Sequence, residues 1–216
     1  MRPHDIRGRL VRRAAKNNVF IGEPLADRLT VYYELLVRWN RKINLTSLEN
    51  LDEAIDRLLL EPLVASRYFS PSANRLMDVG SGGGSPAIPF KLAVPRLKLT
   101  MVEAKARKSA FLREAVRHLS LEDVQVETAR YEELLAKPEL HEAHDVVSLR
   151  AVRTEARVLT TLQAFLAPEG ALMLCRGPSG PQVPATPVPP LEWTATHPLV
   201  ESLQSRLTIL TKRRIR

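Results

Sequence analysis

The chain has 216 residues, of which 44% are hydrophobic, enough for one domain with a sizeable core and an extension. Lysine and arginine number 32 against 24 aspartates and glutamates, and the resulting net charge of +8 favours an anionic partner. The single cysteine, Cys175, excludes an intramolecular disulfide bond and a cysteine-rich zinc site. No apolar run approaches the ~20 residues that span a bilayer, and no secretory signal is present. We therefore expect a cytoplasmic protein with no membrane segment.

Basic side chains cluster at both ends of the chain. Residues 1–20 contain one acid, Asp5, and are interpreted either as a solvated arm or short basic helix, or as an arm that contacts RNA. The last residues, 212–216, form a second basic cluster. If both ends contact RNA, phosphate contacts are expected from Arg9, Arg12, Arg13, Lys212, Arg213 and Arg214.

The first part of the chain has helical periodicity. Apolar residues spaced i, i+4, i+7 and i+11 from Leu25 to Leu36 predict a helix over residues 23–41. A second helix is predicted to begin near Asn50, in a sequence that resembles a capping box, and to be disturbed at Pro62, because proline has no backbone N–H. Residues 1–70 are therefore expected to form an N-terminal helical cap.

The period changes in residues 71–216. Strands are predicted at 76–79, 97–102, 124–126, 146–147 and 171–174, followed by two closing strands at 191–196 and 203–210. Helices are predicted between them, notably over 105–119 and 154–166, and the prolines of 178–190 predict a loop. Strands that alternate with helices imply βαβ units, so we expect an α/β fold with a mostly parallel sheet.

The strongest local signal is the glycine-rich turn over residues 78–86, between a predicted strand and a predicted helix. Glycines let the backbone turn sharply and approach a ligand, and the helix N-terminus offers free N–H groups. A dinucleotide fingerprint that starts at Gly80 would need its third glycine where Ser85 stands. Glycines spaced as Gly80, Gly82 and Gly84, two residues after Asp78, suit S-adenosylmethionine instead.

An acidic residue, Glu103, follows the next predicted strand, 23 residues after Gly80. A carboxylate at that position can accept hydrogen bonds from both hydroxyls of a ribose, whether the cofactor is S-adenosylmethionine or a dinucleotide. Strand, glycine turn, helix and acid together predict a nucleoside-containing cofactor at this edge of the sheet.

Several segments resemble one known family. They are Trp39–Thr46, Asp78–Pro89, Glu103–Leu112, Arg130–Glu133 and Asp145–Ala151. In these segments, and over most of the chain from about Tyr32 to about Gly177, the sequence resembles the glucose-inhibited division protein B family, the small-subunit ribosomal RNA methyltransferase G.

The resemblance implies a doubly wound, seven-stranded, Rossmann-like methyltransferase sheet behind an N-terminal helical cap. It also implies transfer of a methyl group from S-adenosylmethionine to N7 of a guanine in 16S rRNA or the small-subunit precursor. By position it implies cofactor contacts from Gly80, Ser85, Tyr131, Glu132 and Arg150, in addition to Gly82 and Glu103. Tyr131 and Glu132 would lie near the adenine ring. We expect a monomer, with neither a metal nor a proton-transfer residue.

The sequence departs from the family pattern at three places. Ser85 replaces a usual phenylalanine, so an apolar wall of the pocket is absent. The run from Arg57 to Pro62, which includes Leu58 and Glu61, stands where the family has a histidine and an Asp-Ser pair. Arg176 replaces a lysine.

Other functions stay open at this point. One is a methyltransferase for a small molecule or protein, another is an RNA-binding protein with a decayed cofactor pocket, and a third is a nicotinamide dehydrogenase. His141 and His144 have a spacing that permits metal binding, but we interpret them as a solvated loop because no third ligand stands out. Cys175 is predicted to pack in a buried strand.

Overall fold

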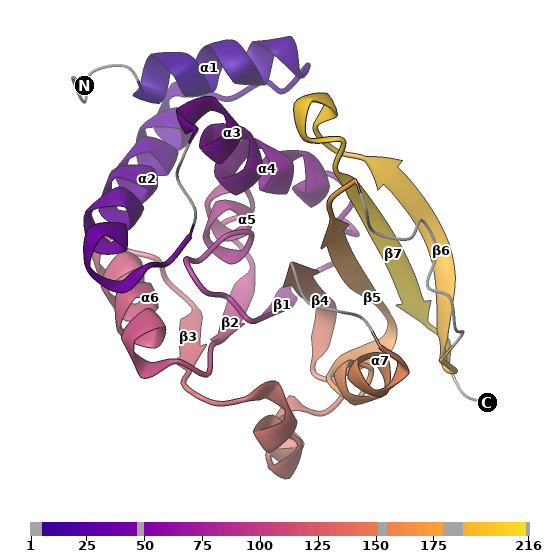
Figure 1. Ribbon diagram of the computed structural model, residues 1–216. Coiled ribbons are helices and arrows are strands. Elements are labelled where there is room, and N and C mark those ends of the chain that lie inside the picture. Colours follow the sequence, from indigo (N-terminus) through magenta and orange to yellow (C-terminus); the bar gives the residue numbers. More distant parts are fainter. Residues whose placement is uncertain (1–5, 47–49, 151–154, 179–187, 215–216) are drawn as a thin grey trace.

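The computed structural model describes residues 6–46, 50–150, 155–178 and 188–214. Its first elements are helices (Figure 1): α1 (Ile6–Lys16), α2 (Glu23–Ile43), α3 (Leu51–Ile55), the π-helical turn η2 (Asp56–Leu60) and α4 (Glu61–Ser66). The predicted start at Asn50 is confirmed, because its side chain accepts hydrogen bonds from the backbone N–H groups of Asp52 and Glu53. The predicted disturbance at Pro62 is also confirmed, since the helix changes to a π-turn just before that residue.

The described strands form one seven-stranded sheet in the order β3-β2-β1-β4-β5-β7-β6. They are β1 (Arg75–Val79), β2 (Lys98–Val102), β3 (Val124–Glu127), β4 (His144–Arg150), β5 (Leu166–Arg176), β6 (Leu191–Pro198) and β7 (Arg206–Lys212). The first five strands are parallel, and β7 pairs antiparallel with both β5 and β6. The predicted doubly wound, mostly parallel α/β fold is confirmed.

Helices cover both faces of this sheet (Figure 1). The remaining ones are α5 (Ala87–Ala93), α6 (Ala106–His118), α7 (Ala156–Leu162) and the short 3₁₀ turns η3 (Tyr131–Ala136), η4 (Pro138–Leu140) and η5 (Glu201–Leu203). The helix predicted to reach residue 166 ends at Leu162 instead, because Leu166 already pairs with His144 in the sheet. Most of the loop predicted at 178–190 lies outside the described residues.

The inner parallel strands β1, β2 and β4 are mostly buried on both sides, as parallel strands covered by helices must be. Leu76 packs in a core with the N-terminal helices, α5 and α6, while its neighbour Met77 packs in a second core with α7. Successive side chains of a strand point to opposite faces, so β1 divides the two cores. Cys175 is buried in the first core, as predicted.

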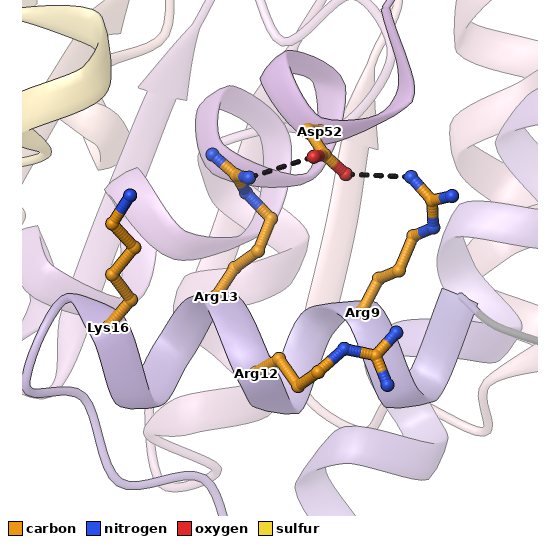
Figure 2. Close-up of a pocket in the computed structure, with 5 residues that line it drawn as sticks. All are labelled: Arg9, Arg12, Arg13, Lys16 and Asp52. Carbon is orange, nitrogen blue, oxygen red and sulfur yellow. Dashed lines mark hydrogen bonds and ion pairs between the residues drawn. The ribbon is translucent and has the colours of Figure 1, made fainter.

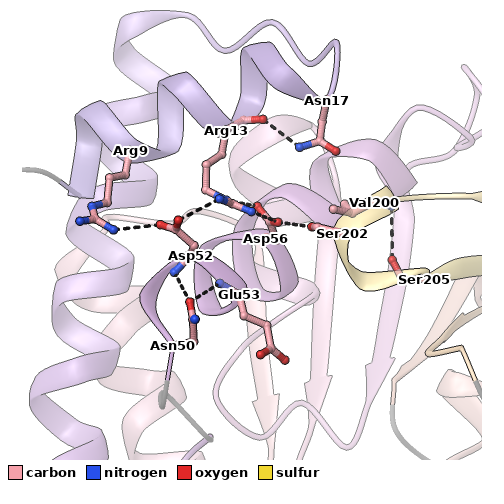
Figure 3. A network of polar contacts seen from close by, with 10 residues as sticks. All are labelled: Arg9, Arg13, Asn17, Asn50, Asp52, Glu53, Asp56, Val200, Ser202 and Ser205. Carbon is pink, nitrogen blue, oxygen red and sulfur yellow. Dashed lines mark hydrogen bonds and ion pairs between the residues drawn. The ribbon is translucent and has the colours of Figure 1, made fainter.

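The N-terminal helices are joined to the rest of the chain by polar contacts as well as by packing. Tyr32 of α2 is fully buried, as predicted, and its hydroxyl donates a hydrogen bond to the Gly83 carbonyl at 2.6 Å. Arg13 of α1 binds the buried carboxylate of Asp56, which also accepts a hydrogen bond from Ser202 near the far end of the chain (Figure 3). Contacts over such sequence separations hold the helices against both the glycine turn and η5.

Two expectations about surface residues are wrong. His144 is a buried residue of β4, within 3.2 Å of the Phe165 carbonyl through Nδ1, and burial lowers the pKa of its imidazole. Lys212 is 5% exposed and donates hydrogen bonds to the Glu142 carboxylate and to two carbonyls. Both residues lie in strands whose register directs their side chains inward, so their polar character alone did not predict their burial.

Across the described residues, no helix is both long enough and apolar enough to cross a membrane.

Candidate cofactor site

The predicted site residues lie along one edge of the sheet, where the parallel strands have their carboxyl ends. The glycine turn follows β1, Glu103 follows β2, η3 begins soon after β3, and Arg150 is the last residue of β4. The sheet order reverses between β1 and β4, because chain connections run outward from this pair in both directions. Open α/β sheets bind ligands at such a switch point, outside the carboxyl ends of the strands.

The glycine turn has the left-handed backbone conformation that favours glycine. Gly80, Gly82 and Gly84 have φ angles of 73°, 51° and 83°. The backbone N–H groups of Gly80 and Ser81 both donate to the Val102 carbonyl, which ties the turn to the end of β2. At Gly84 a Cβ atom would lie 2.5 Å from Ile88 Cδ1, so a side chain there would also displace the end of the buried Ile88 side chain on α5.

Glu103 fixes the same turn from the neighbouring strand. It is 8% exposed, and its Oε2 accepts a hydrogen bond from the Gly82 N–H at 2.9 Å while Oε1 accepts one from the Lys105 N–H at 2.8 Å. Each carboxylate oxygen has two lone pairs, so each retains capacity for a further donor such as a ribose hydroxyl. The structure therefore places Glu103 against the glycine turn, at the sheet edge where the sequence predicted a cofactor.

Asp78, at the base of the turn, has an unsatisfied buried carboxylate oxygen. Its Oδ1 accepts a hydrogen bond from Ser148 at 2.6 Å, whereas Oδ2 is buried with no hydrogen-bond partner in the structure. Burial is the main cause that raises the pKa of this carboxyl to about 6, and Ser148 opposes the shift. A buried acceptor without a donor suits a ligand that brings its own donor or positive charge, and S-adenosylmethionine has an ammonium and a sulfonium.

Ser85 and Arg150 meet at the other side of the turn. Arg150 Nη1 donates hydrogen bonds to Ser85 Oγ at 3.0 Å and to the Arg57 carbonyl at 2.7 Å. Ser85 Oγ in turn donates to the Leu58 carbonyl at 2.9 Å. Both carbonyls belong to η2, so Ser85 and Arg150 form a polar link between the glycine turn, β4 and the N-terminal helices.

Sequence reasoning did not assign a role to Glu61, which lies beside this link. Its side chain is 7% exposed, and Oε1 lies 3.8 Å from Arg150 Nη1. Burial raises the pKa of the Glu61 carboxyl, while the positive charge of Arg150 and a hydrogen bond from Ser205 oppose the rise. An acid next to proline in an otherwise apolar run was the available signal, since a buried acid needs a partner.

Tyr131 and Glu132 open the 3₁₀ turn η3, after the end of β3. Tyr131 is partly buried against the second core, and burial together with the neighbouring Glu132 raises the pKa of its phenol. Glu132 is exposed. The structure therefore brings both residues to the same sheet edge as Glu103, with a half-buried aromatic face that an adenine ring could contact.

The comparisons with known proteins agree with this geometry. Residues 26–211 match the family described as rRNA small subunit methyltransferase G, GidB. The protein of that name from Syntrophotalea carbinolica is 34% identical over 158 residues, which cover 73% of this chain and 72% of the relative. The one from Xylella fastidiosa strain 9a5c is 38% identical over 175 residues, covering 79% and 78%.

Solved structures with the same fold are more distant in sequence. A SAM-dependent methyltransferase from Aquifex aeolicus superposes with a TM-score of 0.56 at 13% identity, covering 74% of this chain and 93% of the other. A variant of MtNAS in complex with S-adenosylmethionine gives a TM-score of 0.56 at 13% identity, covering 96% and 73%. From the family match, the level of identity and the shared fold, we conclude that the chain belongs to the GidB family, rRNA small subunit methyltransferase G.

Proposed function

We propose that the protein transfers a methyl group from S-adenosylmethionine to N7 of a guanine in small-subunit rRNA. The observation that carries the proposal is the glycine turn between two buried carboxylates, Asp78 with an unpaired oxygen and Glu103 bound to the turn itself. Family membership supports rRNA as the substrate over a small molecule or a protein. It also argues against a nicotinamide dehydrogenase, as does Ser85 at the third position of the dinucleotide fingerprint.

We further propose roles for the site residues. Glu103 would accept hydrogen bonds from the ribose hydroxyls, and Tyr131 with Glu132 would border the adenine ring. Gly80 and Gly82 would let the backbone approach the methionine part, near the Asp78 carboxylate. Ser85 and Arg150 would hold the wall of the pocket through their hydrogen bond.

The chemistry asks little of the protein beyond alignment. When bound, the cofactor supplies a methyl group already activated by the positive sulfonium. Guanine N7 has an in-plane lone pair and no proton near neutral pH, so no general base is required. What the chain provides is a rigid cradle that holds the reacting atoms ~3–3.5 Å apart and in line. The reaction therefore needs no proton-transfer residue.

The substrate geometry follows from RNA structure. N7 faces the major groove, which in A-form RNA is too deep and narrow for side chains to enter. We therefore propose that the target guanine lies in a loop or is turned out of its stack. We also propose that the protein is a monomer that acts in the cytoplasm. It would consist of a helical cap over residues 1–70 and a methyltransferase domain over residues 71–216.

The direct test is methyl transfer to small-subunit RNA from cells that lack the gene. Purified protein, S-adenosylmethionine and either protein-free 16S rRNA or small subunits are incubated, and the modified base is mapped by its N7-specific cleavage. We expect one modified guanine and greatly reduced transfer by Glu103→Gln. The exposed Glu192, on β6 away from the turn, gives a matched control in Glu192→Gln.

The outcomes separate the alternatives. Binding of S-adenosylmethionine without transfer to any RNA would contradict the proposal and favour a small-molecule or protein substrate. RNA binding without affinity for S-adenosylmethionine would favour the decayed pocket, and NAD binding would favour a dehydrogenase. A methyl group found on another base or another atom would overturn the N7 assignment.

A further inference from the structure

A strongly basic pocket lies on the outer side of the N-terminal helices, apart from the cofactor site (Figure 2). Its volume is about 300 Å³, and its lining residues are Arg9, Arg12, Arg13, Lys16 and Asp52. Four cations therefore face one carboxylate. We propose that this pocket binds backbone phosphates of the rRNA substrate and that the exposed aromatic ring of Phe20 stacks on a base beside it.

Two carboxylates bind arginines of this pocket. Asp52 pairs with Arg9 and Arg13, each at 3.0 Å, and Arg13 also pairs with the fully buried Asp56 (Figure 3). Arg12 and Lys16 are exposed on α1 (Figure 2). These two residues lie one turn apart on α1, so their positive charges reach solvent together.

The ion pair between Arg13 and Asp56 also pre-orients the pocket. An arginine held by a carboxylate loses less conformational entropy when it binds a second anion, and its planar guanidinium matches phosphate geometry. Arg13 Nη2 and Nε both bind Asp56, which leaves its side chain fixed at the base of the pocket. A fixed cation flanked by exposed ones is suited to a phosphodiester chain.

Phe20 supplies the second observation. It is 92% exposed, although a phenylalanine normally buries its ring. The chain turns back directly after α1, where the Val19 N–H bonds the Ala14 carbonyl at 2.8 Å, so Phe20 lies close to the Lys16 end of the helix. Cations that follow the backbone beside an aromatic ring that accepts a base are the usual features of single-stranded nucleic-acid sites.

An anionic membrane surface is the less favoured partner. The apolar residues Leu10 and Ala14 of α1 are 0% and 1% exposed, since they pack into the protein core. The helix therefore uses its apolar face inside the fold, whereas an interfacial membrane helix buries that face in lipid. RNA needs only the cations and the ring that remain outside.

The pocket is connected to the cofactor site through η2. Asp56, its first residue, binds Arg13 of α1, while the carbonyls of the next two residues hold Arg150 and Ser85. A strand of rRNA seated on α1 would thus contact the same helical layer that borders the cofactor. The inference rests on the proposed function, since it assigns part of the surface that binds the rRNA substrate.

The test measures affinity for protein-free small-subunit rRNA as a function of salt. Arg12→Gln with Lys16→Gln should reduce the slope of log affinity against log salt by about 1.5, because each lost phosphate contact contributes about 0.7–0.9. Affinity for S-adenosylmethionine should not change. As a control, Arg96→Gln with Lys98→Gln removes the same number of charges at the amino end of β2, and it should leave the salt slope unchanged.

Two further variants test the charge of the pocket and the role of the Phe20 ring. Asp52→Asn removes the carboxylate that competes with phosphate for Arg9 and Arg13, so it should tighten RNA binding. Phe20→Ala should weaken binding about 5- to 150-fold with an unchanged salt slope, as the loss of one stacked base does. Trp193→Ala, at an exposed aromatic residue of β6, is its control.

A wild-type salt slope in the Arg12 and Lys16 double variant would overturn the inference. This holds whether or not that variant also loses affinity for phosphatidylserine vesicles, which represent the alternative of an anionic membrane surface. Unchanged or weaker RNA binding by Asp52→Asn would contradict it too. If wild-type protein binds S-adenosylmethionine but neither binds nor methylates rRNA, the proposed function fails. If the wild-type protein methylates rRNA but the pocket variants bind RNA as the wild type does, the inference fails and the proposed function stands.

Discussion

Arg150 Nη1 lies 3.0 Å from Ser85 Oγ and 2.7 Å from the Arg57 carbonyl, so one guanidinium joins β4, the glycine turn and η2. Pro62 explains why these carbonyls are available. It has no N–H for the Leu58 carbonyl, its partner in a regular α-helix, nor for the Arg57 carbonyl, its partner in a π-helix. Ser85 and Arg150 supply the missing donors. The segment 57–62, Ser85 and Arg150 therefore form one hydrogen-bonded unit.

Arg150→Ala should destabilise the protein by about 3 kcal/mol or more, because it leaves the Glu61 carboxylate buried without its cation. Burial already raises the pKa of Glu61, and removal of Arg150 would raise it further. The Glu61 carboxyl of the folded variant then binds a proton more tightly than that of the unfolded chain. The stability of the variant therefore falls as pH rises from the unfolded pKa of Glu61 to its raised folded pKa. Urea unfolding at pH 5 and pH 8 measures the effect.

The control for this prediction is the second substitution Glu61→Gln. In the Arg150→Ala background it should restore stability at pH 8 and remove the pH dependence. A double variant as unstable as the single one would show that the hydrogen bonds to Ser85 and Arg57, rather than the charge of Glu61, account for the role of Arg150 in stability.

Asp78→Asn should separate stability from cofactor affinity. Burial raises the pKa of Asp78 from 3.8 to about 6, so the folded protein binds the proton more tightly than the unfolded chain. Stability associated with this group is therefore present below about pH 4 and is lost as pH rises to about 6, by about 2–4 kcal/mol at 1.36 kcal/mol per pKa unit. In Asp78→Asn this loss should be absent, which urea unfolding between pH 4 and pH 7.5 would reveal.

The same substitution should weaken binding of S-adenosylmethionine, because a neutral amide no longer attracts a cationic ligand. In the wild type, affinity should fall as pH drops below about 6, where Asp78 becomes protonated. Calorimetry at pH 5 and pH 7.5 tests both points. Equal affinity of variant and wild type for S-adenosylmethionine at pH 7.5 would show that Asp78 does not contribute to cofactor binding.

The sequence predicted the parts of the site that depend on local chemistry. A turn with glycines at positions 80, 82 and 84 needs the positive φ angles that the structure shows, and Glu103 follows directly from where β2 ends. These features are determined by neighbouring residues and by strand register. The predicted fold class is equally local in origin, since it depends on alternating strand and helix patterns.

The missed features depend on contacts between distant residues. Arg150 bonds the Arg57 carbonyl across 93 positions, and no pattern near either residue indicates that pairing. The two wrong expectations have the same cause. The residues of β7 before Lys212 are mostly buried, and the register that turns Lys212 inward is set by pairing with β5 and β6.

Glu103→Gln should weaken binding of S-adenosylmethionine by about 1–3 kcal/mol, the range for hydrogen bonds to a charged group. An amide has one acceptor oxygen, so it cannot both hold the Gly82 and Lys105 N–H groups and accept two ribose hydroxyls. Calorimetry with S-adenosylmethionine and with methionine alone would locate the loss. If the methionine affinity fell equally, Glu103 would act only by positioning the turn.

The glycines of the turn provide a matched pair of substitutions. Gly82→Ala meets little at its Cβ, with Gly80 O at 3.7 Å and Lys108 Nζ at 3.9 Å, so it should cost about 1 kcal/mol for its left-handed backbone. Gly84→Ala adds a 2.5 Å contact with Ile88 and should cost clearly more. Thermal unfolding compares them. Equal costs would mean that α5 moves freely to accept the methyl group.

Gly80, which also has a positive φ, allows a test of cofactor binding in the same turn. Gly80→Val should abolish affinity for S-adenosylmethionine while the protein stays folded, because a branched side chain would occupy space that the methionine part needs. Circular dichroism reports the fold and calorimetry the affinity. Wild-type affinity in this variant would exclude the turn from the cofactor site.

Lys212 allows a last prediction that separates structural charge from RNA-binding charge. Its ammonium donates to the Glu142 carboxylate at 2.8 Å and to the Gln163 and Leu166 carbonyls at 2.9 Å and 3.0 Å. Lys212→Met keeps the aliphatic stem but leaves these acceptors without their donor, so unfolding free energy should fall by about 2–4 kcal/mol. The salt slope of rRNA binding should not change, because the buried ammonium contacts no solvent-side phosphate.

Arg213 is the neighbouring control for that substitution. It is exposed and pairs with the exposed Glu192, so Arg213→Gln should change the unfolding free energy much less than Lys212→Met. Urea unfolding and salt-dependent RNA binding are measured on both variants under the same conditions. If Lys212→Met flattened the salt slope by about 0.8 without loss of stability, the C-terminal cluster would bind phosphate after all, and the RNA surface would extend from α1 to the end of β7.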